Sequence, residues 1–181
     1  MQKRLFDVFF SLLGLLLLAP FLFLFWIVTT IDTNSNGMFT QKRVGQFGTL
    51  FSIYKLKTIN DKTAIISKFG NFLRKSKIDE LPQLWNILTG TMSFVGPRPD
   101  IEGYYDKLEG NDRKVLDLKP GLTSLASIKY VNEEEVLNLQ ENSKEYNDEI
   151  IFPDKVKMNL EYYYNQSFVV DLQIIIKTLF R

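Results

Sequence analysis

Two adjacent carboxylates, Asp79 and Glu80, are the residues whose types and spacing best suit chemistry. They lie near the start of residues 76–88, where leucine and isoleucine recur at the spacing of an amphipathic helix. A helix start presents unpaired N–H groups and a partial positive charge, so carboxylates there stay ionised. Such a pair can act as a nucleophile or hold a divalent cation. Acidic residues also favour helix starts without any chemical role, and the spacing alone leaves both interpretations open.

The local sequence predicts where this short helix begins and ends. Ser76 stands three residues before Asp79, as in a capping box. Pro82 suits a first helical turn, because its missing N–H costs little there. Gly90 is the expected stop. A second helix is predicted just upstream, over residues 65–75.

The composition restricts the chemistry that these carboxylates can join. The chain has 181 residues, no Cys and no His, and a net charge of +1. Disulfides, zinc–thiolate sites and nucleophiles activated by His are therefore excluded. The balanced charge gives no electrostatic case for binding nucleic acid. Oxygen ligands remain, and these favour magnesium, calcium or manganese.

The N-terminal part of the chain contains a long hydrophobic segment. Residues 8–31 carry no charge, and as one helix these 24 residues would reach about 36 Å. That length is enough to cross a hydrocarbon core of about 30 Å. The segment is too long for a signal-peptide core and has no small-residue cleavage site, so we expect it to be retained.

Two features of this segment argue against a simple crossing. Pro20 near its middle removes a backbone hydrogen bond and kinks a helix. Basic pairs also flank both ends, Lys3 and Arg4 before and Lys42 and Arg43 after. If positive residues stay cytoplasmic, both ends belong on the same side, which a re-entrant helix satisfies. A spanning helix with a tolerated proline remains open from these residues.

A β-hairpin is predicted next, from residues 38–43 and 50–59 around a Gly-rich turn. Its basic residues include Arg43, Lys55 and Lys57, which form either a solvated strand face or a cluster facing phosphate. Further on, Pro97 and Pro99 bracket Arg98 in a stiff loop. An arginine fixed in this way loses little freedom on binding an anion. A plain structural turn is the alternative.

The C-terminal half predicts helices and one extended stretch. Residues 120–121 mark a turn that leads into an extended segment over 122–131. Residues 133–149 are acidic and predict a surface helix, and Pro153 begins a final helical region. Residues 168–180 carry an apolar face that suits either a core or a membrane interface. The expected fold class is thus α+β and mostly helical, with a membrane segment at 1–36 and a catalytic region at 37–181.

Taken together, these pieces resemble the bacterial sugar transferase family, the small monotopic phosphoglycosyl transferases that initiate assembly of surface glycans. Each motif alone is weak, but the ordered set is specific. Among them, Asp-Glu-Leu-Pro-Gln-Leu stands at 79–84 and Gly-Pro-Arg-Pro at 96–99. The matching segments are residues 3–7, 41–45, 51–55, 73–75, 79–84, 92–99, 119–121 and 171–172.

The resemblance implies a fold and a reaction. The N-terminal helix would re-enter the cytoplasmic face of the bacterial inner membrane, with short surface helices packed on the membrane interface. Asp79 would attack the β-phosphorus of a UDP-sugar, release UMP and pass the phosphosugar to a polyprenyl phosphate such as undecaprenyl phosphate. Glu80 would help Asp79 bind Mg²⁺ and would steer the acceptor. The expected substrate-binding residues are Arg98, Arg43, Lys55, Lys57, Arg74, Pro97 and Pro99.

The resemblance also implies the setting of the reaction. The product would enter a capsule, O-antigen or glycoprotein glycan. The expected partners are membrane lipids, the UDP-sugar, the polyprenyl phosphate, and either another copy of the chain or downstream glycosyltransferases. No nucleic acid is expected.

The chain departs from the usual family pattern at a few positions. Lys57 replaces an arginine, so bidentate contact with an anion is lost there. Ser124 and Ser127 replace a glycine and a glutamine, and Asn159 replaces an aspartate. These changes bear on sugar identity more than on the reaction type, and they keep open the alternative of a catalytically silent relative that organises a glycan-assembly complex. A separate alternative is a glycosyltransferase that moves the sugar without its phosphate and releases UDP.

Overall fold

The structure is a computed structural model in which residues 1–180 are described. By their internal contacts the residues form two compact units. The first combines Met1–Arg43 with Leu50–Met92, and the second combines Val44–Thr49 with the chain from Ser93 onward. These units differ from the division predicted from the sequence, which separates a membrane segment at 1–36 from a catalytic region at 37–181. The predicted division stays a prediction, because contacts within a chain do not mark a membrane boundary.

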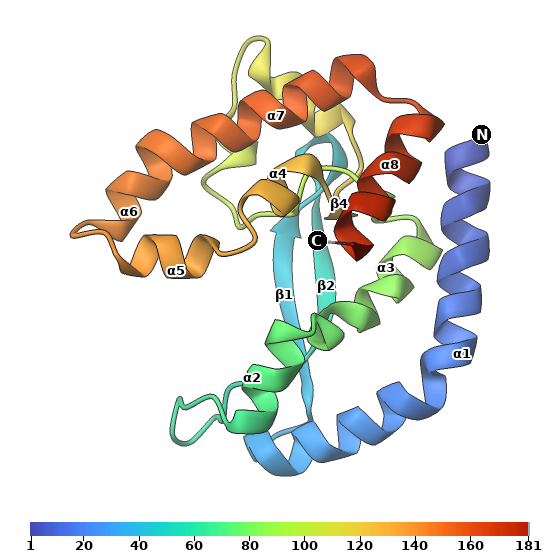
Figure 1. The fold of residues 1–181 in the computed structure, drawn as a ribbon, viewed down its shortest axis with the longest axis vertical. Coiled ribbons are helices and arrows are strands. Elements are labelled where there is room, and N and C mark those ends of the chain that lie inside the picture. The colour runs from blue at the N-terminus through green and yellow to red at the C-terminus, as the bar shows by residue number, and fades with distance from the viewer. Residues whose placement is uncertain (181) are drawn as a thin grey trace. The chain divides into compact units, whose positions relative to one another are not determined.

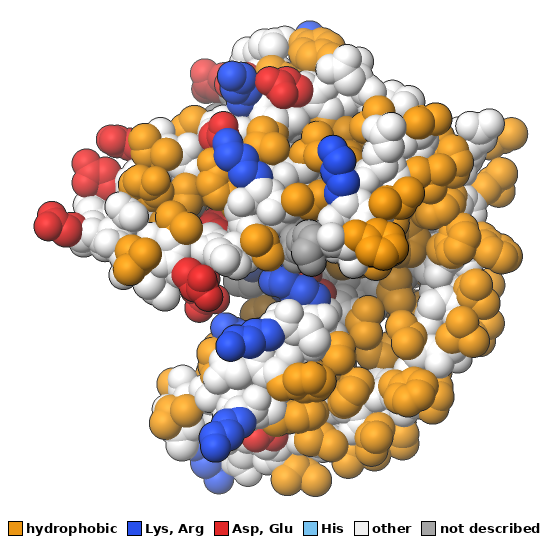
Figure 2. Space-filling model, viewed as in Figure 1, with side chains coloured by type: hydrophobic (Ala, Val, Ile, Leu, Met, Phe, Trp, Pro, Cys, Tyr) orange, Lys and Arg blue, Asp and Glu red, His pale blue; other side chains and the backbone are white. Residues whose placement is uncertain are grey.

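The first unit begins with the long helix α1, Gln2–Thr33, which contains Pro20. Its 32 residues correspond to about 48 Å of helix. Among residues 1–180 it is the one helix long and apolar enough to cross a membrane. Figure 1 shows that α1 bends about halfway along its length, as expected where a proline cannot donate its backbone hydrogen bond. Hydrophobic side chains are exposed along it (Figure 2).

Hydroxyl and indole groups near the C-terminal end of α1 form hydrogen bonds with the segment that follows the helix. The Trp26 indole donates to the Asn36 carbonyl at 2.6 Å. Thr29 Oγ1 donates to the Gly37 carbonyl at 3.2 Å. Gly37 has φ +72°, and an added Cβ would lie 2.4 Å from Thr30 Oγ1. Only glycine therefore fits where the chain turns from the helix into the first strand.

A β-hairpin follows, as predicted. Strand β1, Met38–Val44, pairs with β2, Leu50–Leu56, across the 3-10 turn η1, Gln46–Gly48. The second strand is shorter than predicted, because Ile59 forms an isolated bridge with Ile66 instead of continuing the ladder.

Helix α2, Lys68–Lys75, starts three residues later than predicted. The Ser67 side chain caps it by accepting from the Gly70 amide at 2.9 Å. Ile66, just before this cap, is held in the bridge with Ile59.

The carboxylate-bearing segment differs from the single helix that was predicted. It forms a 3-10 turn, η2, Ile78–Gln83, followed by the short helix α3, Leu84–Thr89. The predicted capping role of Ser76 is wrong, because its hydroxyl donates back to the Phe72 carbonyl at 2.8 Å and so belongs to the end of α2. The predicted stop is confirmed, since Gly90 ends α3 with φ 87°.

The second unit contains a short parallel pair of strands. In β3, Ser93–Val95, and β4, Gly121–Thr123, Ser93 aligns with Gly121 and Val95 with Thr123. The prediction of an extended segment over 122–131 is wrong beyond Thr123. There the Ser124 hydroxyl accepts from the Ser127 amide at 2.9 Å and starts helix α4, Leu125–Lys129. Two 3-10 turns, η3 at Tyr105–Lys107 and η4 at Asp112–Asp117, lie between the strands in sequence.

The C-terminal half of this unit is helical. The single acidic helix predicted over 133–149 is broken into α5, Glu133–Asn138, α6, Ser143–Tyr146, and the π-helical turn η5, Asn147–Ile151. The last two helices are α7, Phe152–Asn165, with Pro153 in its first turn as predicted, and α8, Phe168–Leu179.

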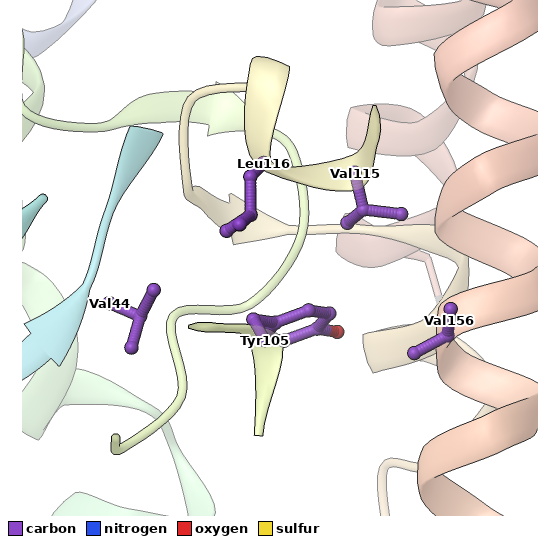
Figure 3. Close-up of a cluster of buried hydrophobic side chains, with 5 residues drawn as sticks. All are labelled: Val44, Tyr105, Val115, Leu116 and Val156. Atoms are coloured by element: carbon purple, nitrogen blue, oxygen red, sulfur yellow. The ribbon is translucent and has the colours of Figure 1, made fainter. Parts of the chain in front are cut away.

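Two hydrophobic clusters hold the second unit together. Figure 3 shows the first, in which Tyr105 lies among aliphatic side chains. The second joins the strand pair to α7 and α8, with Ile174 of α8 at 2% exposure. The first cluster consists of Val44, Tyr105, Val115, Leu116 and Val156. The second consists of Val95, Leu118, Tyr162 and Ile174.

Candidate active site

Asp79 is a buried carboxylate with an unused oxygen. It lies in the first turn of η2 and is 8% exposed. Its Oδ1 accepts no hydrogen bond from any described residue. Burial, and then repulsion from Glu80, raise the pKa of Asp79 above its usual range, while attraction from Lys55, Lys77 and Arg74 opposes the rise. A buried acceptor without a donor is costly, so its retention in the fold needs an explanation.

Glu80 lies in a different environment, although it is the next residue. It is 7% exposed, and its Oε1 accepts from Lys55 Nζ at 2.9 Å. Lys55 comes from β2, so the hairpin supplies the cation and η2 supplies the carboxylate. One carboxylate of the pair is thus neutralised by an ion pair, and the other keeps an oxygen available.

Arg74 and Lys77 complete the positive surroundings of Asp79. Both are close enough to lower its pKa. Arg74 is held by a hydrogen bond from its Nε to Thr58 Oγ1 at 2.9 Å. The structure therefore brings four of the predicted site residues together in the first unit, namely Asp79, Glu80, Lys55 and Arg74.

Two other predicted residues, Arg43 and Lys57, make contacts with their neighbours in sequence. Arg43 donates to Gln41 Oε1 at 2.7 Å. Lys57 forms an ion pair with Asp61 at 2.5 Å. The cations that most affect the pKa of Asp79 are Lys55, Lys77 and Arg74 rather than these two.

Asn86 is a positioning residue that the sequence analysis missed. It is buried in α3, where its side-chain amide donates to the Ser52 carbonyl at 2.7 Å and its Oδ1 accepts from the Tyr54 amide at 3.3 Å. These bonds fasten the helix that follows η2 to the strand that carries Lys55. The available signal was a polar residue between the apolar positions of the helix.

The predicted arginine loop lies in the second unit and is held by its backbone. The Gly96 amide donates to the Thr123 carbonyl at 3.0 Å, and the Gly121 amide donates to the Pro97 carbonyl at 2.8 Å. A Cβ on Gly96 would lie 2.1 Å from the Lys119 carbonyl oxygen, so the two backbones touch. Backbone contacts therefore hold this segment in place in addition to its two prolines.

Arg98 is exposed on this segment, next to a small pocket. The side chains of Pro97, Pro99 and Pro120 line the pocket together with that of Tyr105. Tyr105 is buried, and burial raises the pKa of its hydroxyl. The walls of the pocket are therefore largely apolar, with Arg98 as a cation at its edge.

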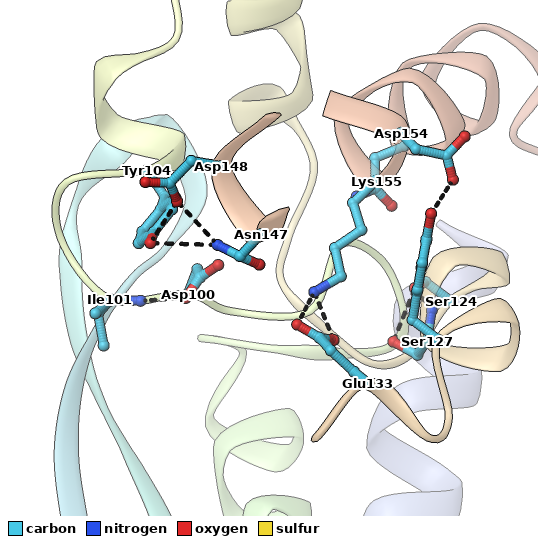
Figure 4. A network of polar contacts seen from close by, with 12 residues as sticks. Asp100, Ile101, Tyr104, Ser124, Ser127, Glu133, Asn147, Asp148, Asp154 and Lys155 are labelled. Atoms are coloured by element: carbon cyan, nitrogen blue, oxygen red, sulfur yellow. Dashed lines mark hydrogen bonds and ion pairs between the residues drawn. The ribbon is translucent and has the colours of Figure 1, made fainter. Parts of the chain in front are cut away.

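The departures from the family pattern in the second unit have structural partners. The Ser124 and Ser127 hydroxyls lie 2.9 Å apart at the start of α4 (Figure 4). Asn159 is buried and donates to the Tyr105 hydroxyl at 2.9 Å. Nearby, Lys155 pairs with Glu133 at 2.6 Å. The hydrogen bonds of Ser124, Ser127 and Asn159 thus support the packing of the second unit.

The arrangement offers a limited metal site. Within residues 1–180 there is no group of three or more His, Cys, Asp or Glu side chains that could hold a metal. Asp79 and Glu80 provide two carboxylates, and Mg²⁺ is commonly held by one or two carboxylates together with water and substrate phosphates. The unpartnered Oδ1 of Asp79 fits such an ion.

Comparison with known proteins identifies relatives of this chain. A putative undecaprenyl-phosphate N-acetylgalactosaminyl 1-phosphate transferase of Bacillus subtilis is 35% identical over 59% of the chain and 66% of its own length. A UDP-glucose:undecaprenyl-phosphate glucose-1-phosphate transferase of Klebsiella pneumoniae is 34% identical over 99% of the chain and 39% of its own length. An uncharacterized sugar transferase of B. subtilis, EpsL, is 32% identical over 98% of the chain and 85% of its own length.

The extent of these matches differs among the relatives. The chain spans about two fifths of the Klebsiella relative and most of EpsL. The profile of the bacterial sugar transferase family matches residues 1–181. The chain therefore belongs to the bacterial sugar transferase family.

Proposed function

We propose that this protein transfers a sugar-1-phosphate from a UDP-sugar to a polyprenyl phosphate such as undecaprenyl phosphate. The product would be a lipid-linked sugar diphosphate that begins a capsule, O-antigen or glycoprotein glycan. The names of the relatives support the reaction class. The observation that carries the proposal is the environment of Asp79, a buried carboxylate with a free acceptor oxygen beside Lys55, Arg74 and Lys77.

In this proposal Asp79 is the nucleophile. A carboxylate oxygen forms a bond to the β-phosphorus, and the bond from that phosphorus to the bridging oxygen of UMP breaks. UMP leaves with the electron pair. An oxygen of the polyprenyl phosphate then bonds to the same phosphorus and displaces the Asp79 carboxylate, which regenerates the enzyme. A covalent intermediate divides one difficult displacement into two easier ones.

Charge neutralisation supplies much of the catalysis in phosphoryl transfer. Lys55 and Arg74 lie with the two carboxylates and suit the diphosphate. Arg98, between Pro97 and Pro99, suits a further phosphate contact on a rigid segment. Arg43 and Lys57 remain proposed substrate contacts, and Lys57 would have to exchange its ion pair with Asp61.

Mg²⁺ is the proposed cofactor, held by Asp79 and Glu80. When bound, it would neutralise charge on the diphosphate. The pairing of Glu80 with Lys55 keeps that side chain in place beside Asp79.

The proposed setting is the cytoplasmic face of the bacterial inner membrane. The bent helix α1 supports a re-entrant path, because the bend allows both ends to lie on one side. Helix α8 supports contact with the membrane interface through Val169, Ile176 and Leu179, together with Phe180 directly after the helix; their exposures run from 55% to 84%. The one acidic residue of α8, Asp171, is buried and accepts from the Tyr162 hydroxyl. The exposed face of α8 therefore carries no negative charge that would oppose lipid headgroups.

Nucleotide release tests this function. The purified protein in lipid discs is given Mg²⁺, undecaprenyl phosphate and a panel of UDP-sugars, beside the Asp79→Asn variant. Release of UMP by the wild type, and none by the variant, is the expected result. Release of UDP would identify a glycosyltransferase, and no release across a broad panel would favour a silent relative that organises a complex.

A further inference from the structure

We propose that Arg4 is a positioning residue that fixes the carboxylate pair to the membrane helix. Its guanidinium would clamp the C-terminal end of α3, the helix that directly follows Asp79 and Glu80. The inference rests on the proposed function for its kinetic consequence, while its structural part stands alone. A basic residue at the head of a hydrophobic segment is ordinarily explained by membrane topology. The contacts of Arg4 indicate a more specific role.

Arg4 contacts two successive carbonyl groups. One terminal nitrogen, Nη1, donates to the Ile87 oxygen at 2.6 Å, and the other, Nη2, donates to the Leu88 oxygen at 2.8 Å. The last carbonyls of a helix have no partner within the helix, and they carry its partial negative charge. A planar guanidinium can donate to both at once, which a lysine ammonium does less well. Arg4 therefore caps α3 from a segment more than 80 residues away in sequence.

The same face of α1 continues the contact. Asp7, Ser11 and Gly14 follow Arg4 at intervals of three, four and three residues, which places all four on one side of a helix. Asp7 and Ser11 are buried, and Ser11 is 0% exposed, although most large side chains of α1 are exposed. A Cβ on Gly14 would lie 3.1 Å from Leu84 Cδ1. The first turns of α1 thus lie against α3 along a stripe of polar and small residues.

A short path leads from this contact to the carboxylates. Helix α3 begins at the residue after η2 ends, so a shift of α3 moves the turn that carries Asp79 and Glu80. Asn86 ties α3 to β2 through Ser52 and Tyr54. In the same strand Lys55 holds Glu80. The Gly90 amide also donates to the Asn86 and Ile87 carbonyls, so Arg4 adds to this backbone cap. Its removal would leave the Leu88 carbonyl without its donor and would free the C-terminal end of α3 from α1.

Charge-matched variants separate positioning from topology. Arg4→Lys keeps the charge at the same position. Arg4→Gln combined with Gln2→Lys keeps the number of positive charges at the head of α1 but removes the guanidinium. Gln2→Lys alone is the matched control, because Gln2 is exposed at the start of α1. If charge alone mattered, Arg4→Lys and the double variant would both behave as the wild type, and Gln2→Lys alone reports the effect of the added lysine.

Turnover is measured in lipid discs with Mg²⁺, undecaprenyl phosphate and the active UDP-sugar. We expect kcat of the double variant to fall by about 10²-fold, since a small misplacement of reacting groups costs that much. KM for the UDP-sugar should change by less than about threefold, because the loss concerns alignment in the transition state. Arg4→Lys should lie between the double variant and the wild type, and the Gln2→Lys control should match the wild type.

Amide hydrogen exchange gives a second readout that needs no activity. Exchange over η2 and α3, Ile78–Thr89, should become at least about tenfold faster in the double variant and stay unchanged in the control, because a helix that has lost this anchor opens locally more often. Unchanged exchange would overturn the inference. Faster exchange with normal turnover would show a clamp that does not position the carboxylates, which would also overturn it. If the wild type turns over no substrate, the proposed function fails, and the exchange over η2 still decides the role of Arg4.

Discussion

Replacing Asp79 by Asn should stabilise the protein while abolishing its proposed activity. The carboxylate is 8% exposed, and one oxygen has no donor among the described residues. A buried carboxylate charge without a hydrogen-bond donor costs at least about 1–3 kcal/mol, and the neutral amide of Asn removes this charge although it keeps an oxygen. Repulsion from Glu80 adds to the cost, and attraction from the three nearby cations reduces it. We therefore expect a net gain of about 1 kcal/mol at pH 8, or roughly 2–4 °C in Tm for a chain of this size.

The pH dependence of this gain has a definite sign. Because the pKa of Asp79 is raised in the folded state, the native protein holds its proton to higher pH than the unfolded chain does. The cost of the buried charge therefore appears as pH rises through the folded pKa, and it is absent below the unfolded value. The difference in Tm between Asp79→Asn and the wild type should be largest at pH 8 and should shrink towards zero near pH 4.

The neighbouring carboxylate gives a control of opposite sign. Glu80→Gln breaks the ion pair with Lys55, whose side chain is only 18% exposed. Loss of a partly buried partner should destabilise the protein by about 2 kcal/mol, between the values for exposed and buried pairs. Differential scanning fluorimetry of both variants from pH 4 to pH 8 checks the two signs. If Asp79→Asn is less stable than the wild type at pH 8, or if its advantage grows in acid, the account of Asp79 as an unsatisfied buried charge is refuted.

Three further predictions concern the elements around the site. Asn86→Ala should lower stability by about 2 kcal/mol, because it leaves the Ser52 carbonyl and the Tyr54 amide unpaired; an unchanged thermal midpoint would contradict this. Gly96→Ala should lower stability by at least about 1–3 kcal/mol, since the added Cβ would collide with the Lys119 carbonyl. KM for the UDP-sugar should also rise, and a variant with the stability and KM of the wild type would show that this contact does not fix the loop. Gln2→Cys introduces the sole thiol of the chain, which should react only with a reagent on the cytoplasmic side. Adding Pro20→Ala should straighten α1 and permit labelling from outside. External labelling with Pro20 in place would refute the re-entrant path.

Local patterns in the sequence predicted the elements that local residues determine. The hairpin, the apolar helix with Pro20, and the end of α3 at Gly90 all follow from turn residues and periodicity. Residues with two competing local partners were harder to predict. Ser76 suited the next helix as a cap, but its hydroxyl bonds to the preceding one. Similarly, Ser124 ends the extended segment by capping α4, a role that its neighbours in sequence do not reveal.

The residue types of the candidate site could be predicted from the sequence, but which carboxylate pairs with which cation could not. The sequence indicated carboxylates near cations, but which carboxylate Lys55 neutralises depends on how β2 lies against η2, a contact between residues 25 positions apart. The hydrogen bonds of Asn86 and Arg4 are longer-range still. Arg4 has an obvious explanation in topology, and only the structure shows two carbonyl groups at its guanidinium. Positioning residues of this kind depend on tertiary contacts that periodicity does not encode.

The central claim is that Asp79 forms the covalent intermediate, and trapping that intermediate tests it most directly. The protein is incubated with Mg²⁺ and its active UDP-sugar in the absence of polyprenyl phosphate, and the peptide that contains Asp79 is examined by mass spectrometry. We expect a sugar-phosphate adduct on this peptide and an equal amount of UMP, with neither in Asp79→Asn. Turnover with the acceptor present, combined with no adduct and no UMP in its absence, would contradict the account and indicate direct transfer.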